Sequence, residues 1–325
     1  MEVFLFEPQT YQRLYNCSFY DVDSIPVERR RNPFLGTLYS LVIYAMLRSQ
    51  FRNQETYRLM IFLGIIHCLG LQACGLATGF FAIQGYVFCS SPTIIYFAGQ
   101  LALATWCASA MTSLLLGFNR CCELYGGGLG QRIFGGYRFW IWISIPLIYL
   151  VYIFVFTPPV TFSSIQMTWL FDPHVDYYPD FGKTYYNRVH SLNNIILCST
   201  ESFLYATLIG LYWRATKSSS NEIKNAFKRE KMIYIQVICV GVIHFTASSI
   251  YVFIQFVHTN VVITMAASTF YLLSQGFPSV IYLCVNRTVR NLVISRLGLR
   301  RRQLATILPS SDPRVAALSS SDVKP

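Results

Sequence analysis

Charged side chains are scarce in this sequence. Only 13% of the 325 residues are Asp, Glu, Lys or Arg, and 54% are hydrophobic, whereas a typical soluble domain is about 25% charged. A soluble fold of this length has no interior large enough to hide so much apolar surface. The composition therefore excludes an ordinary soluble protein and indicates a chain embedded in a membrane.

Seven apolar runs are long enough to cross a bilayer as helices, which need about 20 predominantly apolar residues. They cover residues 33–51, 59–83, 93–118, 139–157, 192–213, 233–257 and 261–285. The first run contains Arg48, so it spans the bilayer only if that side chain extends to the interface. We predict an all-α membrane protein, a seven-transmembrane helix bundle over residues 33–286.

Ionisable side chains are nearly absent from these runs, which excludes several functions. No run contains Lys, so a retinal protein, which needs a Lys for its Schiff base, is excluded. Glu201 is the only acid in any run, and His67 and His244 are the only histidines. An intramembrane aspartyl protease needs two acids, and an intramembrane zinc hydrolase needs clustered His and acid ligands. We expect no enzyme activity, no cofactor and no metal site.

Residues 1–32 lack the basic start, apolar core and small-residue cleavage site of a signal peptide. Most of the 26 Lys and Arg residues fall in the connections that face the cytoplasm if this leader lies outside. We therefore expect a multi-pass plasma-membrane protein with its N-terminus outside, and Asn16 of Asn16-Cys-Ser18 is predicted to carry sugar. The net charge of +11 then suits the surface of the lipid bilayer, and nucleic acid is a poor partner.

Two segments follow the last run. Residues 287–302 are predicted to form a short basic amphipathic helix on the inner face of the membrane. The alternative is a kinked last helix followed by a basic stop-transfer tail. Residues 303–325 are polar and are predicted to be a disordered cytoplasmic tail.

The ten cysteines leave one pair outside the membrane. Six lie within the apolar runs, and Cys121 and Cys122 would face the reducing cytoplasm, where disulfides are rare. Cys17 and Cys89 remain, and we predict that they form a disulfide between the leader and the start of the third helix. Two free thiols are the alternative.

Polar side chains recur at helical spacing along four runs, so they share one face of each helix. Because polar groups face lipid only at high cost, we predict that they surround a ligand cavity between the third, fifth, sixth and seventh helices. Glu201 and His244 would lie near its floor, and the aromatic outer loop 158–191 would be its lid. The alternative is that these side chains only hydrogen-bond helix to helix. The predicted ligand-binding residues are Tyr96, Gln100, Asn194, Glu201, His244, Tyr251, Gln255, Ser268 and Tyr271.

Several short motifs resemble the nematode serpentine receptor class T chemoreceptors. These motifs are Asn16-Cys-Ser18, Asn119-Arg120 with Glu123, Phe134-Gly-Gly-Tyr-Arg138, Phe156-Thr-Pro-Pro159 and Trp169-Leu-Phe-Asp-Pro173. The resemblance covers residues 12 to 300 approximately. It implies a G-protein-coupled receptor fold, a chemosensory role, a small-molecule ligand and a heterotrimeric G protein as partner, and it implies no particular ligand.

The sequence departs from the general pattern of such receptors at three places. Asn119 stands where an acid usually precedes Arg120, Gly276 stands where Asn is usual, and the outer loop 158–191 has no cysteine for the usual bridge. Asn119 and Arg120 are nevertheless predicted to act in G-protein coupling, with Asn119 orienting Arg120. The alternative for Arg120 is a side chain that merely extends to the membrane interface.

We interpret the chain as a G-protein-coupled chemosensory receptor for an unidentified small molecule. A seven-helix transporter or ligand-gated channel is the alternative, because polar helix faces serve those functions equally well.

Overall fold

The computed structural model describes residues 1–18, 55–126, 128–175, 184–217, 221–257, 260–285 and 290. In chain order its elements are α1 (Glu2–Phe6), α2 (Pro8–Leu14), α5 (Glu55–Leu71), the π-helix η2 (Gln72–Ala77), α6 (Thr78–Gln84), the 3-10 helix η3 (Phe88–Ser90), α7 (Pro92–Tyr125), α8 (Leu129–Phe134), α9 (Arg138–Phe156), β1 (Thr161–Ser163), β2 (Thr168–Leu170), α10 (Arg188–Lys217), α11 (Asn221–Phe256) and α12 (Val261–Val285).

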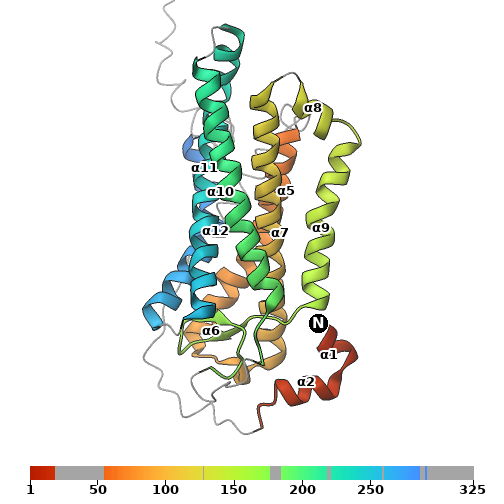
Figure 1. Ribbon diagram of the computed structural model, residues 1–325. Coiled ribbons are helices and arrows are strands. Elements are labelled where there is room, and N and C mark those ends of the chain that lie inside the picture. Colours follow the sequence, from red (N-terminus) through yellow and green to blue (C-terminus); the bar gives the residue numbers. More distant parts are fainter. Residues whose placement is uncertain are drawn as a thin grey trace, which may run out of the picture.

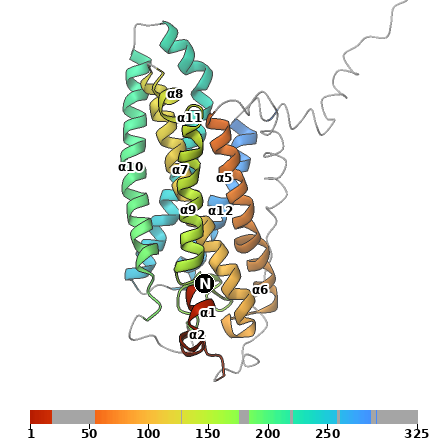
Figure 2. The ribbon, with the colours of Figure 1, turned by 90° about the vertical axis from the view of Figure 1, so that its right-hand side faces the viewer.

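The long helices run side by side in a bundle (Figures 1 and 2). The β1–β2 hairpin crosses one end, with α1 and α2 beside it, and we call this the hairpin end. The opposite end carries α8 and the tips of α10 and α11, and we call it the connector end. The architecture is an all-α membrane bundle with one small β-hairpin.

Five helical stretches among the described residues are long and apolar enough to cross a membrane. They are Thr56–Gln84, Pro92–Tyr125, Arg138–Phe156, Arg188–Arg214 and Val237–Ile254. α12 adds a helix of 25 residues at the position of the last predicted span. The first predicted span, 33–51, lies outside the described residues, as do the segments 287–302 and 303–325 apart from Arg290.

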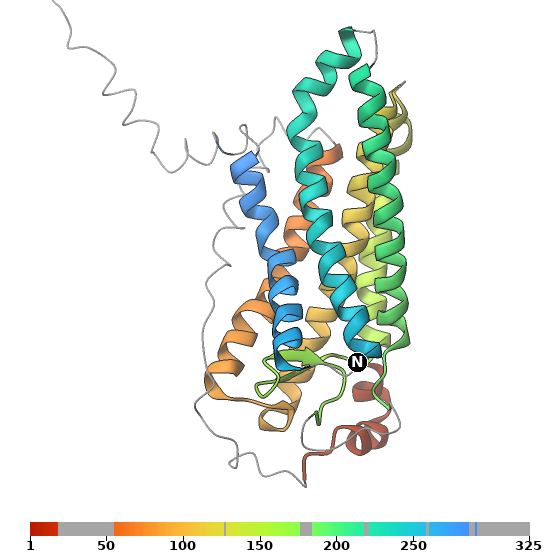
Figure 3. The same ribbon diagram turned by 60° about the vertical axis from the view of Figure 1, so that its left-hand side comes forward.

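Several helices extend beyond the apolar runs that predicted them, among them α7, α10 and α11. α7 continues through Asn119 and Arg120 to Tyr125, and α11 begins at Asn221, well before the predicted run 233–257. α10 and α11 consequently project past their neighbours at the connector end (Figure 3). An apolar run marks only the part of a helix inside hydrocarbon, whereas backbone hydrogen bonds continue into water wherever helix-forming residues such as Glu and Lys follow.

α7 is the central helix and α9 is peripheral. In their most apolar windows, 78% of the α7 residues are buried inside the protein, against 17% in α9. Small residues let neighbouring backbones approach α7 closely. At Gly99 the approach is so tight that an added Cβ would lie 1.6 Å from the Val160 carbonyl oxygen. The chain leaving α9 therefore passes directly over α7 on its way to the hairpin.

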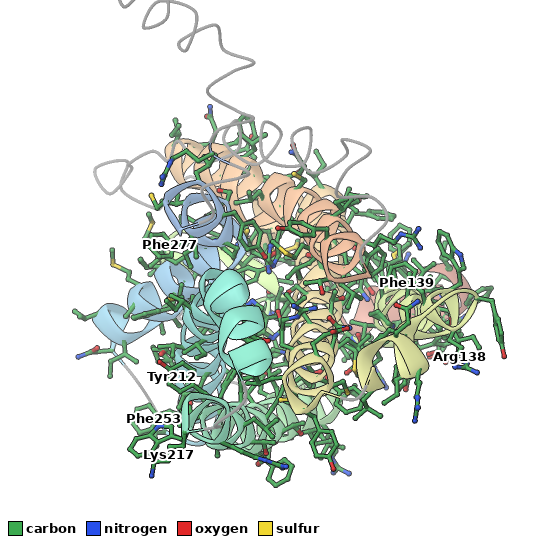
Figure 4. All side chains as sticks on the ribbon, turned by 90° about the horizontal axis from the view of Figure 1, so that it is seen from above. Arg138, Phe139, Tyr212, Lys217, Phe253 and Phe277 are labelled. Carbon is green, nitrogen blue, oxygen red and sulfur yellow. A yellow bond between two sulfur atoms is a disulfide. The ribbon has the colours of Figure 1, made fainter. Side chains whose placement is uncertain are left out.

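The outer faces of the bundle are apolar. Viewed along the helices, Phe253 and Phe277 point away from the bundle, whereas Phe139 lies among the helices (Figure 4). Apolar side chains that point outward are what a lipid-facing surface requires.

The hairpin lies in the outer-loop segment that was predicted as an aromatic lid. β1 and β2 are antiparallel, with Phe162 opposite Trp169. Trp169 Nε1 donates to Thr78 Oγ1 at 2.8 Å, and Thr264 Oγ1 donates to the Gln166 carbonyl at 3.3 Å. The hairpin is thus fixed both to α6 and to α12.

Candidate ligand-binding cavity

An aromatic cavity of about 60 Å³ lies beneath the hairpin. Its walls come from α7, α10, α11 and α12, and its cover is formed by the hairpin and the residues on either side of it. The lining residues are Ala102, Leu103, Trp106, Val160, Trp169, Leu170, Phe171, His190, Tyr251, Ile254 and Tyr271. The four helices and the lid are those expected from the sequence, but of the eight predicted ligand-binding residues whose side chains the structure describes, only Tyr251 and Tyr271 are among the lining residues.

Three aromatic rings form the inner part of the cavity. Trp106 contacts Tyr271 nearly edge to face, with 5.6 Å between ring centroids, and it also packs against Tyr251 at 6.4 Å. The polar ends of two of these rings are already engaged, because Trp106 Nε1 donates to Asn194 Oδ1 at 3.0 Å and the Tyr271 hydroxyl donates to the Ala102 carbonyl at 2.8 Å. A molecule in the cavity would therefore meet mainly the faces and edges of rings.

His190 is a wall residue that the sequence reasoning missed. Its side chain is buried, and its ring lies 5.1 Å from the ring of Phe171 and 6.1 Å from that of Tyr251. The predicted fifth helix began at Leu192, so His190 was assigned to the outer loop. Asn187 was the available signal, because its side chain accepts from the His190 amide at 3.0 Å and caps the start of α10.

Several predicted ligand-binding residues make packing contacts instead, and one of them, Gln100, joins two helices as the helix-packing alternative proposed. Gln100 Nε2 donates to the carbonyls of Ile153 and Phe154, each at 2.7 Å. Tyr96 is buried in an aromatic cluster with the leader. Ser268 forms a hydrogen bond with the hairpin residue Thr168. Spacing places polar residues on the inner face of a helix, but it does not tell which neighbouring group they will bond.

Of two other predicted residues, one lies behind the cavity wall, and the side chain of the other lies outside the described residues. Asn194 connects Trp106 to His190, whose Nε2 lies 3.0 Å from Asn194 Nδ2. Gln255 belongs to α11, and its side chain lies outside what the structure describes.

Glu201 and His244 face each other beyond Trp106 and do not line the cavity. Glu201 Oε1 lies 3.9 Å from His244 Nδ1, and both side chains are completely buried. The His244 ring packs against Trp106, with 5.7 Å between centroids. Among the described residues, neither Glu201 oxygen and neither His244 nitrogen has a hydrogen-bond partner. Polar groups without hydrogen bonds are costly to bury. The pair therefore lies behind Trp106, deeper than the predicted floor of the cavity, at a cost in free energy.

The connector end contains a buried polar network around Arg120. Arg120 Nη2 donates to Asn119 Oδ1 at 2.7 Å and also to Thr56 Oγ1, while Thr56 Oγ1 donates to Asn119 Oδ1 at 2.9 Å. Only 4% of Arg120 is exposed, so its side chain does not extend toward the surface. Asn119 and α5 hold it instead.

The leader is tied to the bundle at the hairpin end. Cys17 and Cys89 form a disulfide with 5.3 Å between their Cα atoms, and Asn16 beside it is exposed. His174 Nε2 lies 3.2 Å from the Asn16 carbonyl, which can only accept, so Nε2 donates. Burial lowers the pKa of His174, and this hydrogen bond opposes the shift. A second glycosylation sequon, Asn286-Arg-Thr288, follows the last apolar run and lies outside the described residues.

Comparisons with known proteins agree with this architecture. Residues 4–306 match the family described as serpentine type 7TM GPCR chemoreceptor Srt. Serpentine receptor class T-55 of Caenorhabditis elegans is 24% identical over 269 residues, which are 82% of this chain and 72% of that relative. The crystal structure of squid rhodopsin matches with a TM-score of 0.61 at 12% identity, over 89% of this chain and 87% of that chain. At that identity the likeness to rhodopsin concerns the fold alone.

Proposed function

This chain belongs to the family of serpentine class T seven-transmembrane chemoreceptors, and from this premise we propose that it is a G-protein-coupled chemosensory receptor for a small molecule. The hairpin end, with its disulfide and exposed sequon, would lie outside the plasma membrane. The connector end would face the cytoplasm and the heterotrimeric G protein.

The observation that carries the proposal is the aromatic cavity bordered by four helices and by the hairpin. A molecule bound there contacts α7, α10, α11 and α12 at the same time. If its affinity differs between two arrangements of these helices, it shifts the population toward the arrangement that it binds better. The hairpin residues that line the cavity add to the burial that small ligands require.

Trp106 offers a physical connection from the cavity to the deeper polar pair. It lines the cavity, its indole nitrogen is held by Asn194 of α10, and its ring packs on His244 of α11. A ligand that displaces this ring would therefore act on α10 and α11 together. Glu201 and His244 belong to the same two helices, so their contact would change with any relative movement.

At the connector end, Arg120 is the residue proposed to act in coupling. A buried guanidinium held by Asn119 and Thr56 is available to a partner only if α5 and α7 change their contact. Binding at the hairpin end and exposure of Arg120 at the connector end would then be two properties of one helix rearrangement.

Arg120→Ala tests the coupling role in cells that carry a G protein and a second-messenger reporter. After a ligand screen has identified an agonist, we expect the variant to bind it and to reach the cell surface but to lose the second-messenger response. Arg132→Ala, which alters an exposed arginine on α8, should respond like the unmodified receptor. Loss of surface expression by Arg120→Ala would contradict a signalling role, and an agonist-evoked current that persists without any G protein would favour a channel.

A further inference from the structure

The hydrogen bonds around the cavity fix the chemistry that it presents to a ligand. Accepting the proposed function of this cavity as its premise, we propose that it binds a compact, uncharged, largely apolar molecule with one hydrogen-bond acceptor, such as a small ketone, aldehyde or ester. The group that recognises the acceptor is the Nδ1–H of His190.

The orientation of the Asn194 amide is the first step. Its Oδ1 accepts from Trp106 Nε1 at 3.0 Å and from Asn193 Nδ2 at 3.2 Å. An indole nitrogen can only donate, so the atom facing it must be the amide oxygen. The other atom of the Asn194 amide is therefore its nitrogen, which is a donor.

The protonation of His190 follows from this orientation. Asn194 Nδ2 lies 3.0 Å from His190 Nε2, and because Nδ2 donates, Nε2 must accept with its lone pair. A neutral imidazole carries one ring proton, which then resides on Nδ1. An Nε2–H tautomer or a doubly protonated ring would place the Nε2–H donor of His190 against the Nδ2–H donor of Asn194.

His190 Nδ1–H is a buried donor without a hydrogen-bond partner among the described residues, on a side chain that lines the cavity. The His190 side chain is 5% exposed. Other polar ends in the wall are engaged: Trp106 Nε1 by Asn194, Trp169 Nε1 by Thr78, the Tyr271 hydroxyl by the Ala102 carbonyl, and the Tyr251 hydroxyl by Ser268 and Thr168. A buried donor without an acceptor is costly. An acceptor atom on the ligand would therefore form a hydrogen bond that is missing when the cavity is empty.

Size and charge narrow the ligand class further. The cavity of about 60 Å³ is smaller than the cavity of about 150 Å³ that accommodates benzene in an engineered protein. None of the described residues that line it is an acid, a lysine or an arginine. A charged ligand would lose its hydration without gaining an opposite charge, and aromatic rings alone would have to hold a cation.

Three probes of similar shape test the inference on purified receptor in lipid nanodiscs. 2-Butanone carries an acceptor, 2-methyl-1-butene replaces its oxygen by CH₂, and sec-butylamine is a cation at neutral pH. Binding is measured directly, by saturation-transfer NMR, with no G protein present. We expect 2-butanone to bind about tenfold more tightly than the alkene, the effect of pairing one buried donor, and the amine to bind least.

Two variants locate the donor. His190→Phe keeps an aromatic wall without the N–H, so the preference for ketone over alkene should fall to about one while the alkene still binds. His190→Gln restores a donor and should recover part of the preference. His174→Phe, which alters a histidine that does not line the cavity, should keep the full preference.

Each unfavourable result is decisive. Equal affinity of the unmodified receptor for ketone and alkene, tighter binding of the amine, no binding of the ketone, or an unchanged preference in His190→Phe would overturn the inference. These readouts are independent of signalling. A receptor that prefers the ketone through His190 but activates no G protein would leave the inference standing and contradict the proposed function, whereas a signalling receptor with no such preference would do the reverse.

Discussion

Gly99→Ala should destabilise the protein although alanine is the better helix former. The added Cβ would lie 1.6 Å from the Val160 carbonyl oxygen and 3.2 Å from the Trp169 ring. Both neighbours belong to the segment that covers the cavity. The carbonyl is backbone and cannot rotate away as a flexible side chain would, so the start of the hairpin segment must move.

The magnitude follows from two opposing effects. Replacing an interior helical Gly by Ala contributes about 1 kcal/mol to helix stability. Forcing a methyl group into a filled contact costs about 1 to 3 kcal/mol, and the rigid neighbour places this case at or above the upper end. The free energy of unfolding should therefore fall by about 2 kcal/mol, which for a chain of 325 residues corresponds to a Tm lower by about 3 °C.

Gly210→Ala is the matched control. Gly210 lies in α10, and no neighbouring atom lies within 4 Å of an added Cβ. The control should be as stable as the unmodified protein or more stable by up to about 1 kcal/mol. The stability of both variants is measured by thermal unfolding in nanodiscs. Unfolding is detected from the labelling of cysteines that are buried in the folded protein. A Gly99→Ala protein as stable as Gly210→Ala would refute the close contact between α7 and the hairpin segment.

Three further predictions concern residues named above. Glu201→Gln and His244→Ala should each change the potency of an identified agonist while surface expression persists, as a dose–response series with surface labelling would establish; unchanged potency in both would make the pair mere packing. Asn16→Gln should abolish a glycosidase-sensitive mobility shift on gels, and a shift that persists would argue against an outside N-terminus. Replacing Cys17 and Cys89 by Ser should lower the free energy of unfolding by about 2 to 4 kcal/mol, measured by thermal unfolding, and an unchanged Tm would show that the bridge does not stabilise the fold.

The long helices were predictable because lipid demands uninterrupted apolar sequence. α9 is Arg138–Phe156 where 139–157 was predicted, since a charge precedes the run and Pro158-Pro159 follows it. The start of α11 was not predictable in this way. Residues beyond the hydrocarbon are polar whether they form helix or loop, and the apolar pattern carries no information about them.

The β-hairpin could not be predicted from the sequence pattern either, but for a different reason. Thr161–Ser163 and Thr168–Leu170 are three residues each, too short for alternation to identify a strand. Their pairing depends on contacts with residues far away in sequence, such as the hydrogen bond from Trp169 to Thr78. Strand structure there is decided by the surface that the segment covers.

The candidate site was predictable in outline and not in detail. Helical spacing identified the four helices around the cavity, since the inner face of each helix carries its polar residues. The same rule could not distinguish Tyr271, which lines the cavity, from Gln100, whose amide bonds the end of α9. His190 was not predicted because it precedes the apolar run. Trp106 was not predicted because an aromatic residue within an apolar run does not stand out as polar.

Filling the cavity beneath the hairpin tests whether the agonist binds there. Ala102 lines the cavity and is 1% exposed, so Ala102→Leu places extra carbon atoms in the space that the ligand would occupy. Ala206→Leu adds the same atoms at an exposed position of α10. With an agonist from the screen, we expect Ala102→Leu to lose at least about tenfold in potency at normal surface expression, while Ala206→Leu should keep the potency of the unmodified receptor. Equal potency for all three proteins would place the ligand elsewhere.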